Sequence, residues 1–208
     1  MPDLSFRVED AAPVAYAAAP ALGLRVRVEN ADSAEEIRGI SLHCQIRIEA
    51  ARRSYSAAEQ RALVDLFGAP ERWGQTLRSM LWAHAAAAVP AFRGAATVVL
   101  PVACTFDLTV ATAKYFHGLE QGCVPLSLLF SGSVFYEDED GGLALQQIPW
   151  SKEAAYALPS AVWGEMMDTY YPNTAWLCLR RDVADRLRRY QAERGMASWE
   201  QALESLLP

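Results

Sequence analysis

The sequence predicts an α+β fold, a mainly antiparallel β-sandwich or sheet with a helical insertion at about residues 57–89 and C-terminal helices. Three observations support this. Segments with a period of two lie on both sides of a helical stretch, helix-capping signals mark that stretch, and further capping signals follow near the C-terminus. Strict alternation of strands and helices is missing, which disfavours a doubly wound sheet.

The first strands are marked by alternation of apolar and polar residues. In "LGLRVRVEN", Leu24, Val26 and Val28 share one face, and arginines occupy the other. This period is that of a half-buried strand. "ISLHCQIRIEA" alternates in the same way, so we expect these two segments to pair as an antiparallel hairpin. Before them, "LSFRV" predicts a short strand, followed by an irregular Ala/Pro-rich arm.

The helical insertion is bounded by Ser56 and Pro90. "SAAE", from Ser56 to Glu59, forms a capping box, and Gly68 fits a helix C-terminus. Pro70 can begin a second helix, which Pro90 would stop. The residues that recur at helical spacing in this second segment are Trp73, Leu77, Leu81 and His84.

Later segments return to the strand period. "ATVVLPVACTFDLTVA" predicts a strand with Pro101 at a sheet edge, because proline cannot donate to a ladder. "VPLSLLFSGSVFY" and "LALQQIPW" flank an acidic loop, which is typical of a β-hairpin. Gly132 in the first of these marks a bulge or a close approach of backbones.

The C-terminal part, residues 160–208, is predicted to be mostly helical and packed on the sheet. Ser160, Asp182 and Ser198 provide helix starts, and "TAWLCLR" predicts a short strand between two of the helices. The length of 208 residues fits a single domain over residues 1–208.

Composition narrows the classes of function. The net charge is −6, which argues against nucleic acid and anionic membranes as partners, since both require matching basic residues. "MPDLSFRVED" has no apolar core of a secretory signal, so we expect a cytoplasmic, soluble protein. The four cysteines form no Cys-x-x-Cys pair and are expected to be reduced thiols.

Cofactor and metal motifs are missing from the sequence. It has no Walker loop, dinucleotide fingerprint or Gly-x-Ser-x-Gly elbow, so no cofactor is predicted. The acidic run Glu137–Gly141 fails the EF-hand pattern because Tyr136 falls at its first position and no Glu falls at its twelfth. A solvated hairpin turn is the favoured interpretation, and no metal site is assigned, although scattered Cys and His side chains can converge in a fold.

One polar cluster is dense enough to suggest chemistry. "AKYFHGLEQGC" brings Lys114, His117 and Cys123 close in sequence, and a Cys nucleophile with a His base is one possibility. The surrounding "GCVP" lacks the sequence context of known cysteine nucleophiles. We favour a structural role for the cluster, assign no catalytic residue, and keep an enzyme as the alternative.

The aromatic segment "WGEMMDTYYPNTAW" is the most distinctive stretch. Trp and Tyr are enriched in interface hot spots, and Met adapts to irregular surfaces. Core packing at the open end of a sandwich is the competing interpretation. The candidate partner-binding residues are Trp163, Met167, Tyr170, Tyr171 and Trp176.

Four segments carry a family resemblance: "PLSLLFSGSVFY", "IPWSKEA", "LPSAVWGEMMDTYYPNTAWL" and "SWEQALESLL". They resemble a family of uncharacterised proteins from high-GC Gram-positive bacteria, a domain of unknown function, over nearly the whole chain. Members of that family tend to be encoded beside NiFe-hydrogenase subunits and maturation factors. The resemblance implies a non-catalytic accessory or adaptor protein with a hydrogenase subunit or maturation factor as partner. A chaperone-like binder of unfolded chains is a further alternative, and the oligomeric state stays open.

Overall fold

The computed structural model describes residues 1–104, 110–138, 140–174 and 179–207. Within it the chain forms two compact units, Met1–Asn173 and Thr174–Pro208. The first unit holds all the described strands, and the second holds two helices. The fold class predicted from the sequence is confirmed, because antiparallel sheets and C-terminal helices are both present. The single domain over residues 1–208 stays a prediction.

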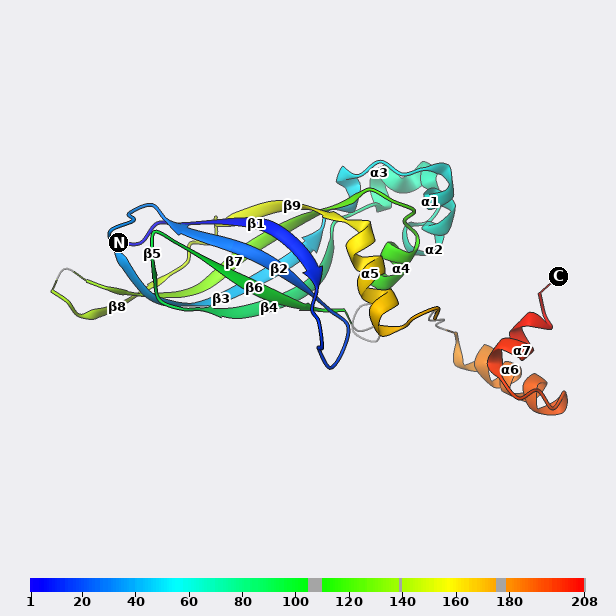
Figure 1. Ribbon diagram of the computed structural model, residues 1–208. Coiled ribbons are helices and arrows are strands. Elements are labelled where there is room, and N and C mark those ends of the chain that lie inside the picture. Colours follow the sequence, from blue (N-terminus) through cyan, green and yellow to red (C-terminus); the bar gives the residue numbers. More distant parts are fainter. Residues whose placement is uncertain (105–109, 139, 175–178, 208) are drawn as a thin grey trace. The chain divides into compact units, whose positions relative to one another are not determined.

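Two antiparallel sheets build the first unit (Figure 1). One has three strands in the order β1-β2-β6: β1 (Leu4–Pro13), β2 (Ala21–Asn30) and β6 (Ala95–Ala103). The other has the path β4-β3-β7-β8, with β5 on β3 and β9 on β7. Its strands are β3 (Glu36–Ile48), β4 (Met80–Val89), β5 (Phe92–Arg93), β7 (Cys123–Glu137), β8 (Leu143–Gln147) and β9 (Glu153–Pro159).

The core lies between the two sheets and follows from their alternation. Leu24 and Val26 of β2 are fully buried, as is Leu128 of β7. The rings of Phe6 in β1 and Phe130 in β7 stack with centroids 4.3 Å apart, so they join one sheet to the other. Each fully buried aliphatic or aromatic side chain contributes about 2 kcal/mol through removal from water.

The predicted hairpin between the two early alternating segments is wrong. β2 pairs with β1 and β6, whereas β3 pairs with β4, β5 and β7 in the other sheet. The alternation correctly identified both strands. It indicates only which face of a strand is buried, and not which other strand lies beside it in the sheet. The expected irregular arm is also shorter, because β1 continues through a bulge after Val8 as far as Pro13.

The helical insertion is shorter than the predicted range of 57–89. Its helices end at Thr76, and Met80–Val89 is strand β4. A register shift opposite Ile46 and Arg47 displaces the alternation of β4 by one residue. Trp82, Ala85 and Val89 are therefore all buried, at spacings of three and four that imitate a helix.

Short helices gather at one end of the sandwich, and the N-terminus and the β7–β8 hairpin lie at the other (Figure 1). The predicted capping box at Ser56 is confirmed, because its side chain accepts from the Glu59 N–H and the Glu59 carboxylate accepts from the Ser56 N–H. The elements are the single 3-10 turns Ala50–Arg52 and Pro70–Arg72 and the helices α1 (Ala57–Ala62), α2 (Val64–Phe67), α3 (Trp73–Thr76), α4 (Val110–His117) and α5 (Ser160–Tyr170).

Two local predictions about strands are confirmed. Pro101 lies in β6, at the edge of its sheet, opposite Gly23. At Gly132 the backbone has a φ of +128°, and an added Cβ would lie 2.0 Å from the Ser41 carbonyl oxygen. The strand predicted to continue beyond β6 includes residues 105–109, which lie outside the described residues, and Val110 begins a helix.

The second unit is a pair of helices, α6 (Arg181–Glu193) and α7 (Trp199–Glu204). Gly195 follows α6 with a φ of +61°, and the Ser198 side chain accepts a hydrogen bond from the Gln201 N–H. The predicted strand "TAWLCLR" falls largely on residues 175–178, outside the described residues. In the first unit, α5 contacts β1 and β2. The predicted packing of the C-terminal part, residues 160–208, on the sheet stays a prediction.

Candidate functional site

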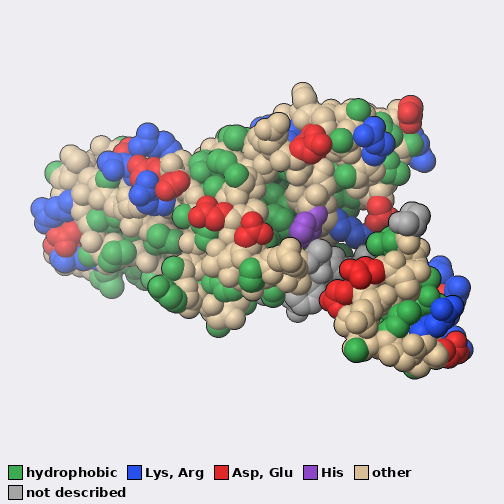
Figure 2. Space-filling model, turned by 45° about the vertical axis from the view of Figure 1, so that its right-hand side comes forward, with side chains coloured by type: hydrophobic (Ala, Val, Ile, Leu, Met, Phe, Trp, Pro, Cys, Tyr) green, Lys and Arg blue, Asp and Glu red, His purple; other side chains and the backbone are tan. Residues whose placement is uncertain are grey.

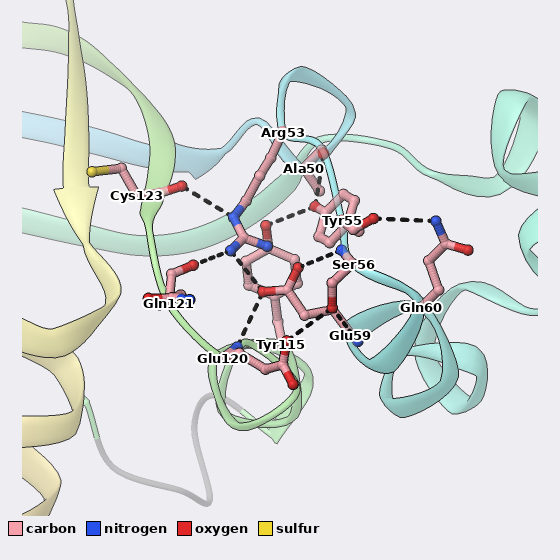
Figure 3. Close-up of polar contacts among 10 residues, drawn as sticks. All are labelled: Ala50, Arg53, Tyr55, Ser56, Glu59, Gln60, Tyr115, Glu120, Gln121 and Cys123. Carbon is pink, nitrogen blue, oxygen red and sulfur yellow. Dashed lines mark hydrogen bonds and ion pairs between the residues drawn. The ribbon is translucent and has the colours of Figure 1, made fainter.

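A buried ion pair organises the helical end of the first unit (Figure 3). Arg53 Nη2 lies 2.7 Å from Glu59 Oε1, and the two side chains are only 9% and 5% exposed. The same guanidinium donates to the carbonyl oxygens of Gln121, at 2.5 Å, and Cys123, at 3.2 Å. Glu59 therefore compensates the charge of Arg53, and Arg53 fixes the loop that leads into β7.

Two tyrosines complete this network. The Tyr55 hydroxyl donates to the Ala50 carbonyl at 2.7 Å, so its oxygen is left to accept from Tyr115 at 2.8 Å. Tyr115 is fully buried, and burial raises its pKa. Arg53 lies over the Tyr55 ring, 5.1 Å from its centroid. We interpret the network as structural, since its polar groups serve to hold the loop and the helices together.

Beside this network lies a groove of about 490 Å³ between the α4–β7 loop and α5. It brings together His117 and Cys123 of the polar cluster with Trp163 of the aromatic segment. Lys114 is not part of its lining and forms an ion pair with Asp65. The lining residues are Phe116, His117, Leu119, Glu120, Gln121, Gly122, Cys123, Pro159, Ser160, Ala161, Trp163 and Gly164.

The chemistry available in this groove is a thiol and an imidazole. Cys123 is exposed, and its sulfur points away from the Arg53 network (Figure 3). His117 meets the edge of Trp163 with ring centroids 4.8 Å apart, and burial lowers its pKa, which favours the neutral base. Burial raises the pKa of the Cys44 and Cys104 thiols to about 12, so both are inert near neutral pH.

The aromatic segment divides between core and surface. Trp163 and Met167 are buried, and Trp163 stacks on Phe116 with centroids 5.1 Å apart. Tyr170 is half-buried and donates to the Val14 carbonyl oxygen at 2.9 Å. Tyr171 is also half-buried, and Trp176 lies outside the described residues. Core packing thus explains the apolar character of Trp163 and Met167. The partner-binding role of the segment stays a prediction.

The described residues contain no group of three or more His, Cys, Asp or Glu side chains placed to hold a metal ion. At the acidic run, the Asp138 carboxylate accepts from the Asp140 N–H at 3.1 Å and the Gly142 N–H at 2.7 Å. These bonds close the turn between β7 and β8, as expected for a hairpin. Charged side chains of both signs lie together elsewhere on the sandwich (Figure 2). Arg7 and Glu9 of β1 form one ion pair of this unit.

The second unit carries a surface that the sequence interpretation missed. None of the residues of α6 is buried. Two apolar grooves, of about 470 Å³ and 220 Å³, border this helix. The spacing of Val183, Leu187 and Tyr190 by four and three residues is the signal in the sequence that indicates this face. The most exposed large apolar side chains of the unit are Leu179, Trp199, Leu203, Leu206 and Leu207.

Comparison with protein families gives one match over residues 1–208, to the family of unknown function DUF6084. The chain belongs to this family. The resemblance predicted from the sequence is therefore confirmed as far as membership of a family of unknown function. No curated protein matches the chain. None of the described helices combines the length and the apolar character that crossing a bilayer requires.

Solved structures offer only distant likeness to this DUF6084 chain. A putative late embryogenesis abundant protein is 14% identical, with a TM-score of 0.31, and the match covers 76% of this chain and 73% of that one. A β-glucosidase from Kluyveromyces marxianus is 12% identical, with a TM-score of 0.28, covering 75% of this chain. The chain spans 15% of that enzyme's length. β-Glucosidase 3B from Thermotoga neapolitana is 13% identical, with a TM-score of 0.27, covering 75% and 17% of the two chains.

Proposed function

We propose that this protein is a non-catalytic accessory protein that binds another protein through its C-terminal helical unit. The observation that supports this most strongly is the exposure of large apolar side chains on α6, α7 and their flanks. Trp199 is 42% exposed, Leu206 57% and Leu207 69%. Contiguous exposed apolar side chains commonly mark a binding surface.

The size of the unit explains why these side chains remain exposed. A segment of fewer than about 40 residues rarely buries enough apolar surface to hold its own core. Covering such side chains with a partner contributes about 25 cal/mol per Å² of apolar surface removed from water. Association with a partner therefore stabilises both the complex and the helical pair.

The resemblance suggests where this partner is to be sought. Members of the resembling family tend to be encoded beside NiFe-hydrogenase genes, so we propose a hydrogenase subunit or maturation factor as the partner. The cytoplasm, predicted from the sequence, is the proposed compartment. We propose that Tyr170, Tyr171 and Trp176 also take part in partner binding, as a contact region separate from the helical pair, and that the buried Trp163 and Met167 support Tyr170 and Tyr171 from the core.

The test is affinity purification of the tagged full-length chain from its host, compared with two double variants. Leu206→Glu with Leu207→Glu is expected to reduce recovery of the hydrogenase protein at least tenfold, because charged side chains replace the apolar contact. Leu143→Glu with Leu145→Glu is the matched control, since these leucines of β8 are similarly exposed, at 73% and 55%. Equal recovery with both variants would contradict the assignment of the surface.

The aromatic segment needs its own test. Replacing Tyr170 and Trp176 by Ala is expected to abolish partner binding if the segment takes part. Unchanged binding by a folded double variant would remove these residues from the interface. A chaperone-like role is separated by a further measurement, since suppression of the aggregation of unrelated unfolded proteins is expected only from a general binder.

A thiol enzyme is the second candidate, because the structure brings His117 and Cys123 to one groove. The neutral imidazole favoured by the lowered pKa of His117 can accept a proton from a thiol. The discriminating measurement is the alkylation rate of Cys123 at neutral pH, compared with that of a free cysteine. A faster rate that falls in His117→Ala favours the enzyme, and a rate no faster than that of free cysteine argues against it.

A further inference from the structure

We propose that the larger groove beside α6 binds an acidic amphipathic helix of the partner protein. This inference rests on the proposed function and names the chemistry of the partner segment. The groove has a volume of about 470 Å³ and lies wholly within the second unit. Its lining residues are Val183, Arg186, Leu187, Arg189, Tyr190, Glu193 and Leu206.

The floor of the groove is an apolar stripe. Val183, Leu187 and Tyr190 are four and three residues apart, so they lie along one face of α6. From Val183 to Tyr190 the stripe runs about 10 Å along the helix axis, which matches about two turns of a second helix. Leu206, beyond the end of α7, adds an exposed side chain to the same floor.

The rim of the groove is mainly basic. Arg186 and Arg189 line it, and neither forms an ion pair with any residue that the structure describes. The arginines that do form pairs lie outside its lining, Arg180 with Asp182 and Arg188 with Asp185, each at 2.9 Å. Glu193 is the one acidic residue of the lining. Two guanidinium groups are therefore available to carboxylates on a bound segment.

An amphipathic helix with acidic flanks fits this combination. Its apolar residues would cover the stripe, and its Asp or Glu side chains would reach the guanidinium groups, which bind carboxylates in a planar, two-pronged geometry. A lipid surface fits less well. Residues 174–208 carry six arginines together with five carboxylates, so the net attraction to an anionic membrane is small.

The experiment measures binding of a labelled synthetic peptide to the full-length chain by fluorescence anisotropy. The peptide has about five helical turns, with Leu at positions i, i+3, i+4 and i+7 and Glu elsewhere. A second peptide with Lys in place of every Glu is the control for general apolar binding. We expect the acidic peptide to bind at least tenfold more tightly, and less tightly as salt concentration rises.

Matched charge reversals locate the site. Arg186→Glu is expected to weaken binding of the acidic peptide about tenfold, because a repulsive contact replaces an attractive one. Arg181→Glu makes the same change of charge at an exposed position of α6 outside the groove lining, and is expected to have little effect. Equal weakening by both variants, or no binding of the acidic peptide to the wild type, would overturn the proposal.

Three further outcomes would each contradict the acidic-helix proposal and show what takes its place. Binding to anionic phospholipid vesicles that Arg186→Glu abolishes would replace the peptide by a lipid surface. A molecular mass in solution that doubles with concentration, and is halved by Arg186→Glu, would identify a second copy of the chain as the occupant. If the hydrogenase protein is recovered equally with wild type and Arg186→Glu, the acidic-helix proposal fails while the accessory function stands.

Discussion

The sandwich of the first unit and the helical pair of the second use apolar residues in opposite ways. In the sandwich, leucines and valines from both sheets are fully buried, and Phe130 is 1% exposed. In the helical pair, no residue of α6 is buried. Among the described residues of this unit, Ala202 of α7 is the one apolar residue that is buried. The sandwich thus encloses its own apolar core, whereas several large apolar side chains of the helical pair are exposed.

This contrast separates stability from binding. Substitutions in the sandwich should change the free energy of unfolding and leave the intrinsic affinity of the partner surface unaltered. Substitutions of the exposed apolar side chains on the helical pair should change the affinity for the partner, with little change in the free energy of unfolding. The following predictions compare a position in one unit with a position of similar chemistry in the other, test the ion pair that supports the sandwich, or test the helical pair by itself.

The largest expected effect is that of Phe130→Ala. This side chain stacks on Phe6 between the two sheets, so its loss leaves a cavity and is expected to lower the free energy of unfolding by about 4 kcal/mol. Leu203→Ala, at a side chain that is 37% exposed, is expected to cost less than about 1 kcal/mol. Urea unfolding followed by tryptophan fluorescence measures both, and equal losses would remove the contrast between the units.

Gly132→Ala is expected to cost about 3 kcal/mol, because the new Cβ would overlap the Ser41 carbonyl oxygen in a backbone conformation that already disfavours side chains. Gly195→Ala is the matched control. Its φ of +61° is also unfavourable, but nothing lies within 4 Å of the added Cβ, so a loss of about 1 kcal/mol is expected. Thermal unfolding of the two variants compares them, and similar losses would show that the backbone angle dominates over the close approach.

Glu59→Gln tests the buried ion pair. Burial raises the pKa of Glu59, but the hydrogen bonds and the charge of Arg53 outweigh it, and the net shift is downward. A lowered pKa means that the stabilisation is complete above the ordinary value of 4.5 and is lost as the pH falls through the lower folded-state value. We expect Glu59→Gln to lose about 2 kcal/mol at pH 7.

The pH dependence provides the check on this prediction. The difference in unfolding free energy between wild type and Glu59→Gln should shrink as the pH falls below 4.5 and through the lowered pKa of the folded-state carboxylate. Chemical unfolding at a series of pH values measures this. A difference that stays constant down to acid pH would mean that Glu59 acts through packing alone.

Apart from the control variants, Ser198→Ala is expected to have the smallest effect. Its side chain accepts from the Gln201 N–H at 3.2 Å, and loss of such a cap typically costs about 1 kcal/mol of helix stability. Amide hydrogen exchange in α7 should accelerate, while exchange in the sandwich should not change. Faster exchange in the strands would indicate that the two units are coupled more tightly than the contrast between them implies.

Prediction from sequence succeeded where a local pattern has a single structural cause. Period-two alternation located β2, β3 and β7, and the Ser56 capping box located α1, because both patterns depend on neighbouring residues. Prediction failed where a residue distant in the sequence determines the local structure. The helical spacing of Trp73, Leu77, Leu81 and His84 runs from α3 into β4, where Leu81 and His84 are exposed on a strand that pairs with the distant β3.

The candidate sites show the same limit. His117 and Cys123 are close in sequence, so their presence in one groove was accessible to sequence reasoning, but the contribution of Trp163 required the fold. The sequence predicted a helix starting at Asp182, but the apolar face formed by Val183, Leu187 and Tyr190 emerged only from the structure. Whether such a face is covered depends on how much other apolar surface the chain supplies, which the spacing of residues does not report.

The position of β7 has a consequence for how the chain folds during synthesis. β7 pairs with β3 along nearly its whole length, from the Ile37–Tyr136 pair to the Ile48–Leu126 pair. Since these partners are far apart in sequence, the larger sheet cannot close until most of the first unit has left the ribosome. Pairings of high contact order fold slowly, typically in milliseconds to seconds. The nascent chain therefore passes through a period in which the apolar face of β3 is uncovered and open to aggregation.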